Sequence, residues 1–143
     1  MSLAGIRFFS ENTDYTQKNK TNTVSWIKKV IIAEGKKTGT VNFIFCDDDT
    51  LHQLNVSYLK HDTLTDILTF DFSEGFSVSG DIYISTDRVK ENAKLFSQDF
   101  NQEIHRVIIH GILHLCGHHD ESKKEKAAMT DKENFYLAWR NAQ

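Results

Sequence analysis

Hydrophobic residues recur along the chain with two periods, and the shorter period predicts strands. Segments of alternating or clustered apolar side chains, rich in β-branched and aromatic residues, are typical of strands. By this criterion strands are expected at residues 6–9, 40–46, 66–72 and 80–85. The connection at 73–79 contains Gly75, so the last two strands are expected to form a hairpin.

The longer period, with apolar residues at every third or fourth position, predicts helices. Helices are expected from caps at 21–23 to Gly35, after the acidic run 47–49, from a cap at Thr86 or Asp87 to Phe96, from about residue 99, and at 121–139. The acidic run is interpreted as a helix N-terminus, which negative charge stabilises, and not as a metal cluster. In the final helix, Met129, Phe135 and Trp139 are expected to face inward.

The order of these elements predicts the fold class. Strands that precede the terminal helices favour an α+β fold, a small mixed sheet of about four strands covered by helices. Of the 143 residues, 39% are hydrophobic and 26% are charged, which fits a single domain over residues 1–143. No apolar run approaches the roughly 20 residues that span a bilayer, and no signal segment is visible. We therefore expect a cytoplasmic protein without membrane contact.

The net charge of the chain restricts how it can bind nucleic acid. The net charge of −3 argues against nonspecific binding along a nucleic-acid backbone, so any RNA contact has to be local.

Cys46 and Cys116 stand far apart in apolar surroundings and are interpreted as buried free thiols. Cys116 is expected to pack in the core and not to bind metal.

Residues 110–120 are rich in histidine and predict a metal site on a long central helix. On a helix, His110 and His114 lie on one face about one turn apart, so both can reach a single ion. Gly117 is expected to end the helix in a left-handed conformation and to turn the chain back. One of the residues His118, His119 and Asp120 can then face the histidine pair.

The spacing of this segment resembles the zinc motif of metzincin proteases. Those enzymes carry a glutamate directly after the first histidine as the general base, whereas this chain has Gly111 there. Peptide hydrolysis by that route lacks its proton acceptor, so a protease is not favoured.

Three blocks of the chain resemble the YbeY family of bacterial rRNA maturation endoribonucleases. The blocks are His-Gly-x-Leu-His-Leu-x-Gly at 110–117, Leu-Asn-x-x-Tyr at 54–58 with Thr-Asp-Ile-Leu-Thr-Phe at 65–70, and Gly-Asp-Ile-x-Ile-Ser at 80–85. The chain departs from the family at three places. His119 and Asp120 replace an Asp-His pair, Leu59 replaces an arginine, and Leu64 replaces a proline.

The resemblance implies a site and its residues. The third-ligand role falls on Asp120 by spacing, with His119 as the second candidate. The implied cofactor is one zinc ion, with another divalent transition metal possible, and no organic cofactor is expected. Lys60 is a candidate for phosphate contact in place of the missing arginine. Asp66 and His119 are candidates for the general base.

The resemblance also implies a function. It is metal-dependent cleavage of single-stranded RNA in the maturation and quality control of small-subunit ribosomal RNA, with ribosomal RNA and the small ribosomal subunit as partners. The alternative is a non-catalytic, zinc-containing ribosome-assembly factor. Structural zinc sites are usually closed by four protein ligands, whereas catalytic sites keep one position open, so the number of ligands distinguishes the two.

Overall fold

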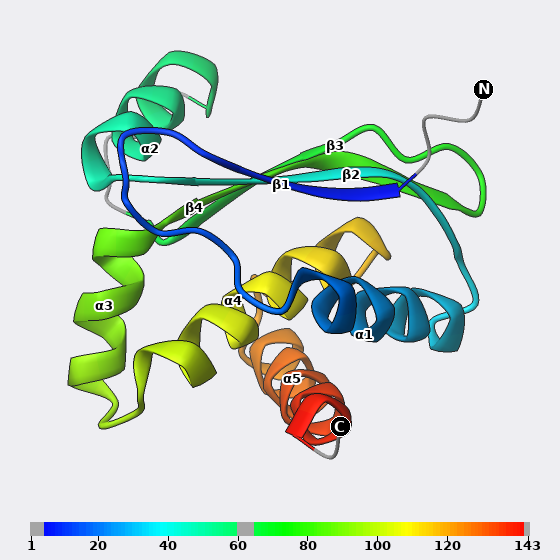
Figure 1. Ribbon diagram of the computed structural model, residues 1–143. Coiled ribbons are helices and arrows are strands. Elements are labelled where there is room, and N and C mark those ends of the chain that lie inside the picture. Colours follow the sequence, from blue (N-terminus) through cyan, green and yellow to red (C-terminus); the bar gives the residue numbers. More distant parts are fainter. Residues whose placement is uncertain (1–4, 60–64, 142–143) are drawn as a thin grey trace.

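The computed structural model describes residues 5–59 and 65–141, which form one mixed sheet covered by helices (Figure 1). The strands are β1 (Gly5–Ser10), β2 (Lys37–Cys46), β3 (Ile67–Asp71) and β4 (Ser77–Ser85). Their order is β1-β2-β4-β3, with β1, β2 and β4 parallel and β3 antiparallel to β4. This confirms the α+β class, the four strands and the hairpin, although β2 and β4 begin earlier than the pattern predicts.

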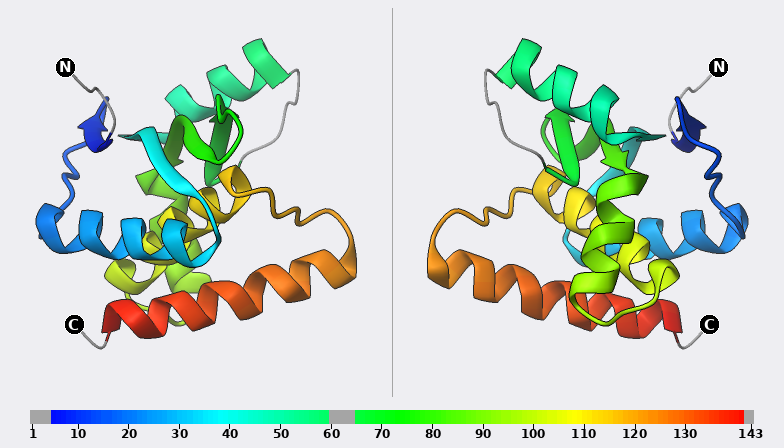
Figure 2. Two further views of the ribbon diagram at one scale, coloured as in Figure 1. Left: turned by 90° about the vertical axis from the view of Figure 1, so that its right-hand side faces the viewer. Right: turned by 90° about the vertical axis from the view of Figure 1, so that its left-hand side faces the viewer.

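The helices lie on both sides of this sheet. They are α1 (Lys20–Ala33), α2 (Asp48–Leu54), which continues as a π-helical turn at Asn55–Leu59, α3 (Thr86–Leu95), α4 (Phe100–Leu115) and α5 (Lys123–Asn141). In Figures 1 and 2, α1 and α4 lie beneath one face of the sheet with α5 beyond them, and α2 lies on the opposite side. None of the described helices combines the length and the apolar character that crossing a membrane requires.

Side chains of the residues that precede the helices cap several of them. The Asp47 carboxylate accepts from the Thr50 amide at 2.9 Å, so the acidic run is a cap as predicted. Asp99 caps α4 in the same way. The cap of α3, however, is Ser85 and not Thr86 or Asp87. Ser85 ends β4 in an extended conformation, which is the backbone geometry of an N-cap, so the helix begins one or two residues earlier than predicted.

The main core lies between the sheet and α1 and α4. Alternate residues of the strands point into it, which explains why β2 and β4 read as alternating patterns. Its fully buried members include Phe43 and Phe45 of β2, Ile82 and Ile84 of β4, Ile27 and Ile31 of α1, and Ile104, Ile108 and Ile112 of α4. A smaller cluster of Cys46, Leu51 and Leu68 lies beneath α2. Both cysteines are free, and Cys116 is only partly buried against the main core.

The buried face of α5 differs from the predicted one. Met129 is buried as expected and Trp139 packs partly against the core, but Phe135 is 58% exposed. Tyr136 takes the inward position instead, and its carbonyl accepts a hydrogen bond from the Trp26 indole at 2.8 Å. The inward face of α5 also carries a buried carboxylate, Glu133, which apolar periodicity cannot reveal.

A buried histidine of α4 should make stability depend on pH. His105 is 2% exposed, with Nδ1 2.6 Å from the Asn101 carbonyl and Nε2 3.1 Å from the Gln17 amide nitrogen. The carbonyl needs a donor and the amide donates, so these contacts require a neutral ring with its hydrogen on Nδ1. Burial lowers the pKa of His105 to about 4.

The unfolded chain therefore binds a proton below its own histidine pKa, near 6.5, that the folded protein does not bind. We expect the free energy of unfolding of the metal-free protein to fall by about 3 kcal/mol between pH 6.5 and 4 through this group alone. His105→Phe should flatten that part of the profile in urea titrations, whatever its effect at pH 7. Parallel profiles for the two proteins would show that His105 is not the group responsible.

Candidate metal centre

The histidine pair lies on the side of α4 that the core leaves free. The opposite side of the helix is buried, whereas His110 and His114 are partly exposed. Their rings stand 4.5 Å apart between centroids, and their Nε2 atoms are 2.9 Å apart. Helical spacing therefore brings the two imidazoles together as predicted.

A left-handed turn brings a carboxylate to this pair. Gly117 has φ +103°, and the His118 amide donates to the Leu113 carbonyl at 3.0 Å, which closes the end of the helix. The chain then returns so that Asp120 Oδ2 lies 3.2 Å from His110 Nε2 and 3.5 Å from His114 Nε2. Of the three residues that could face the pair, the turn brings Asp120. His119 is exposed and lies outside this group.

The three side chains fit a tetrahedral metal ion. Their ligand atoms all lie within 4.8 Å of one another. With zinc–ligand bonds near 2.0–2.1 Å, neighbouring ligand atoms of a tetrahedron stand about 3.3 Å apart, and the three separations here bracket that value. His110, His114 and Asp120 can therefore hold a metal ion. Among the described residues the group contains these three candidate ligands.

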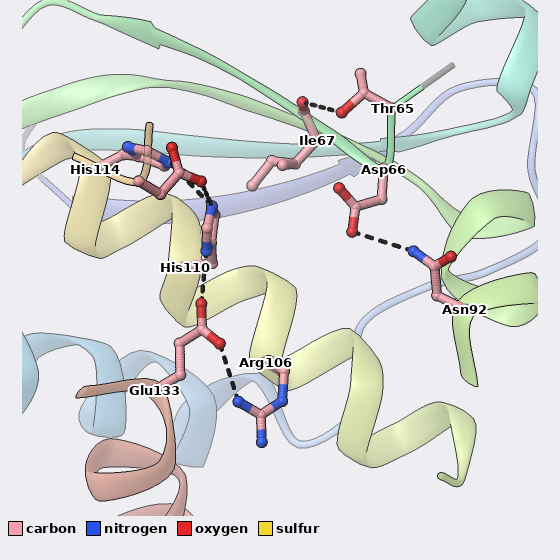
Figure 3. Close-up of polar contacts among 9 residues, drawn as sticks. Thr65, Asp66, Ile67, Asn92, Arg106, His110, His114 and Glu133 are labelled. Atoms are coloured by element: carbon pink, nitrogen blue, oxygen red, sulfur yellow. Dashed lines mark hydrogen bonds and ion pairs between the residues drawn. The ribbon is translucent and has the colours of Figure 1, made fainter. Parts of the chain in front are cut away.

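Glu133 supports the first of these ligands from behind (Figure 3). His110 Nδ1 lies 2.6 Å from Glu133 Oε2, and the other carboxylate oxygen accepts from Arg106 at 2.9 Å. A histidine whose far nitrogen donates to a carboxylate presents its other nitrogen to a metal with a fixed orientation. Glu133 is not among the residues predicted from the sequence. The one available signal is an acidic residue four positions after Met129 on the inward face of the last helix.

The two histidines differ in their affinity for protons. Burial lowers the pKa of His110, but the hydrogen bond and the charge of Glu133 outweigh it, and the net shift is upward. Burial and the neighbouring His110 lower the pKa of His114. His114 therefore stays neutral and ready to bind, while a proton on His110 competes with the metal as the pH falls.

The group lies in a cleft of 460 Å³ between α4 and β3. The residues that line it are Leu59, Thr65, Asp66, Ile67, Leu68, Thr69, Glu103, Arg106, Val107, His110, His114, Asp120 and Glu133. Asp66 points into the cleft opposite His110 and accepts a long hydrogen bond from Asn92 at 3.4 Å (Figure 3). Burial raises the pKa of the Asp66 carboxyl. Lys60 lies outside the described residues.

Gly111 explains why the site lacks the protease base. A Cβ at this position would lie 3.0 Å from side-chain carbons of both Ile67 and Ile82. The residue after the first ligand therefore faces the sheet at close approach and not the cleft. A glutamate there would be buried among isoleucines, out of reach of a substrate.

Removing the charge of Glu133 should weaken the site without dismantling it. We expect Glu133→Gln to raise the metal dissociation constant by about tenfold or more, because the amide supports His110 less strongly than a carboxylate. Competition against a coloured chelator measures this. Asn134→Ala is the control, because it removes the other partner of Arg106, 2.7 Å away, and leaves Glu133 in place. Equal affinities for wild type and Glu133→Gln would contradict the supporting role.

Comparison with known proteins assigns the chain to a family. The model of the family described as endoribonuclease YbeY matches residues 8–140. Endoribonuclease YbeY of Christiangramia forsetii is 48% identical over 138 residues, 96% of each chain. That of Parabacteroides distasonis is 46% identical over 133 residues, 93% of this chain and 94% of its own. The solution structure of TM1509 from Thermotoga maritima matches with a TM-score of 0.63 and 30% identity, over 96% of this chain and 93% of the other. The chain therefore belongs to the endoribonuclease YbeY family.

Proposed function

We propose that this chain is a zinc-dependent endoribonuclease that cuts single-stranded RNA during maturation and quality control of small-subunit ribosomal RNA. The observation that carries the proposal is the convergence of His110, His114 and Asp120 at an open cleft, in a member of this family. Its partners would be ribosomal RNA and the small ribosomal subunit, and its place of action the cytoplasm, where bacterial ribosomes are assembled.

The donor set supports zinc as the ion. Two imidazoles and one carboxylate with an open fourth position are a common catalytic zinc arrangement. The anionic ligand also suits a harder ion such as manganese, so another divalent transition metal is the second choice. Metal analysis of protein purified without added metal decides between them.

The charges in the cleft support a direct role for the ion in holding RNA. Among the residues that the structure describes, the cleft is lined by the carboxyl groups of Asp66, Glu103, Asp120 and Glu133 and by the guanidinium of Arg106. Arg106 is already engaged by Glu133. Without an ion these described groups carry a net negative charge, which disfavours a phosphodiester. We therefore expect chelation to abolish RNA binding in the cleft as well as cleavage.

Each residue of the centre has a part in the proposed reaction. Bound zinc supplies Lewis acidity, which acidifies water and stabilises charge on the scissile phosphate. His110, His114 and Asp120 hold it, and Glu133 keeps the His110 ring in place. Asp66, opposite His110, is the proposed proton acceptor, because burial brings its pKa closer to the working pH of a general base. His119 is not proposed for this role, because it lies outside the cleft.

The test is cleavage of a labelled, unstructured RNA by the metal-loaded protein. We expect slow cutting that stops with chelator, returns with zinc and weakens steeply with salt, while DNA and peptides stay intact. If the loaded protein leaves RNA whole but still binds small ribosomal subunits, the enzyme proposal fails and a non-catalytic assembly factor replaces it.

A further inference from the structure

The third ligand lies in the connection between α4 and α5, which Figure 2 shows as the orange coil that joins these helices. This connection is held at both ends. Before Asp120, His118 Nε2 lies 2.5 Å from Glu34 Oε1. After it, the Ser122 amide donates to the Glu125 carboxylate at 2.9 Å, and the Glu125 amide donates to the Ser122 hydroxyl at 3.0 Å. The position of Asp120 therefore depends on two fixed points.

Glu34 is the centre of the first fixed point. Glu34 is the C-cap residue of α1, and its side chain is only 8% exposed. The carboxylate forms hydrogen bonds with three partners from two other segments. Besides His118, it accepts from Lys132 Nζ at 3.1 Å and from the Tyr136 hydroxyl, both on α5. Burial alone would raise the pKa of Glu34, but its three hydrogen-bond partners outweigh burial and lower it. The carboxylate is thus charged at neutral pH and bonds strongly.

The three partners of Glu34 do not serve the same purpose. Lys132 and Tyr136 connect α5 to Glu34 at the end of α1, and these two hydrogen bonds do not involve the turn. The His118 contact does not link α1 to α5, because His118 belongs to neither helix. It connects the turn, two residues before Asp120, to a buried carboxylate that the two helices already fix.

We propose that the Glu34–His118 contact positions the third metal ligand, holding Asp120 beside His110 and His114 before the ion binds. This inference rests on the metal centre of the proposed function. Without the contact, metal binding has to order the turn itself. Fixing the backbone of one residue reduces an equilibrium constant by about tenfold, so the affinity for zinc should fall by about that factor.

The experiment compares His118→Ala with Lys132→Met, each of which removes one partner of Glu34. Zinc dissociation constants come from chelator competition, and the stability of the metal-free proteins from urea unfolding in EDTA. We expect His118→Ala to bind zinc about tenfold more weakly and Lys132→Met within about twofold of wild type, although Lys132→Met unfolds more easily. His118→Gln, which keeps a donor for Glu34, should recover part of the affinity.

A double-mutant cycle separates positioning from general damage. Combining Glu34→Gln with His118→Ala should weaken zinc binding little more than the stronger single substitution, because both break one contact. If His118→Ala does not fold, the zinc dissociation constants of Glu34→Gln and His118→Gln are compared with that of Lys132→Met instead. Unchanged zinc affinity in the His118 variants, with a wild type that binds zinc and cuts RNA, overturns the positioning role and leaves the proposed function intact. A wild type that binds no zinc overturns both.

Discussion

His114→Ala should lose its metal and, with it, all measurable cleavage of RNA. Two ligands then remain, and two ligands hold a transition metal poorly, so the dissociation constant is expected to rise by more than about 100-fold. His114 is partly exposed and its ring stacks edge-on against His110, so the stability of the metal-free protein should change by less than about 1 kcal/mol. Metal content, RNA cleavage and urea unfolding measure the three effects.

The matched control for this change is His119→Ala. It removes the same side chain from an exposed position outside the metal group, five residues further along. This variant should keep both metal and activity. A His114→Ala protein that retains a full equivalent of metal would refute the centre described here, and one that cuts RNA without metal would point to a contaminating nuclease.

Asp120→Ala should reduce metal affinity by a comparable factor, because its carboxylate lies beside both histidines, where it can serve as the third ligand. Asp120→His should retain the ion, since imidazole is an equally good ligand. A neutral third ligand offsets less of the charge of the ion, so the pH profile of RNA cleavage by Asp120→His should move to lower pH.

Glu121→Ala provides the control for charge, because it removes an exposed carboxylate next to Asp120. Chelator competition ranks these variants together with His119→Ala. A larger loss in His119→Ala than in Asp120→Ala would mean that the turn after Gly117 is one residue shorter in the metal-bound protein.

Much of the fold could be predicted because local patterns of hydrophobic residues indicate its strands and helices. The alternation in β2 and β4 and the periodicity of α4 arise from one buried face each, so the elements and the histidine pair follow from the sequence. The inward face of α5 was predicted wrongly at one position, because the more apolar residue was preferred to the better placed one. At about 100° per residue, position 136 lies about 20° around the helix from Met129, whereas position 135 lies about 120° away.

The supporting residues of the metal centre could not be predicted, because they reach it through packing. Glu133 contacts His110 across 23 residues, and Glu34 contacts His118 across 84. No spacing rule relates such pairs, since their distance depends on how α1 and α5 dock against α4. The candidate ligands lie on one helix and in the turn that follows it, so their spacing in the sequence was informative. The residues that contact them from other helices have no such fixed spacing.

The close packing at Gly111 bears on how this scaffold could be redesigned. Adding a glutamate at that position would not produce a peptidase, because successive residues of a helix point about 100° apart and this one points into the sheet. A designer would have to rotate α4 about its axis and rebuild the contacts of Ile67 and Ile82. A base introduced from β3, at the opposite wall of the cleft, would need no such rotation.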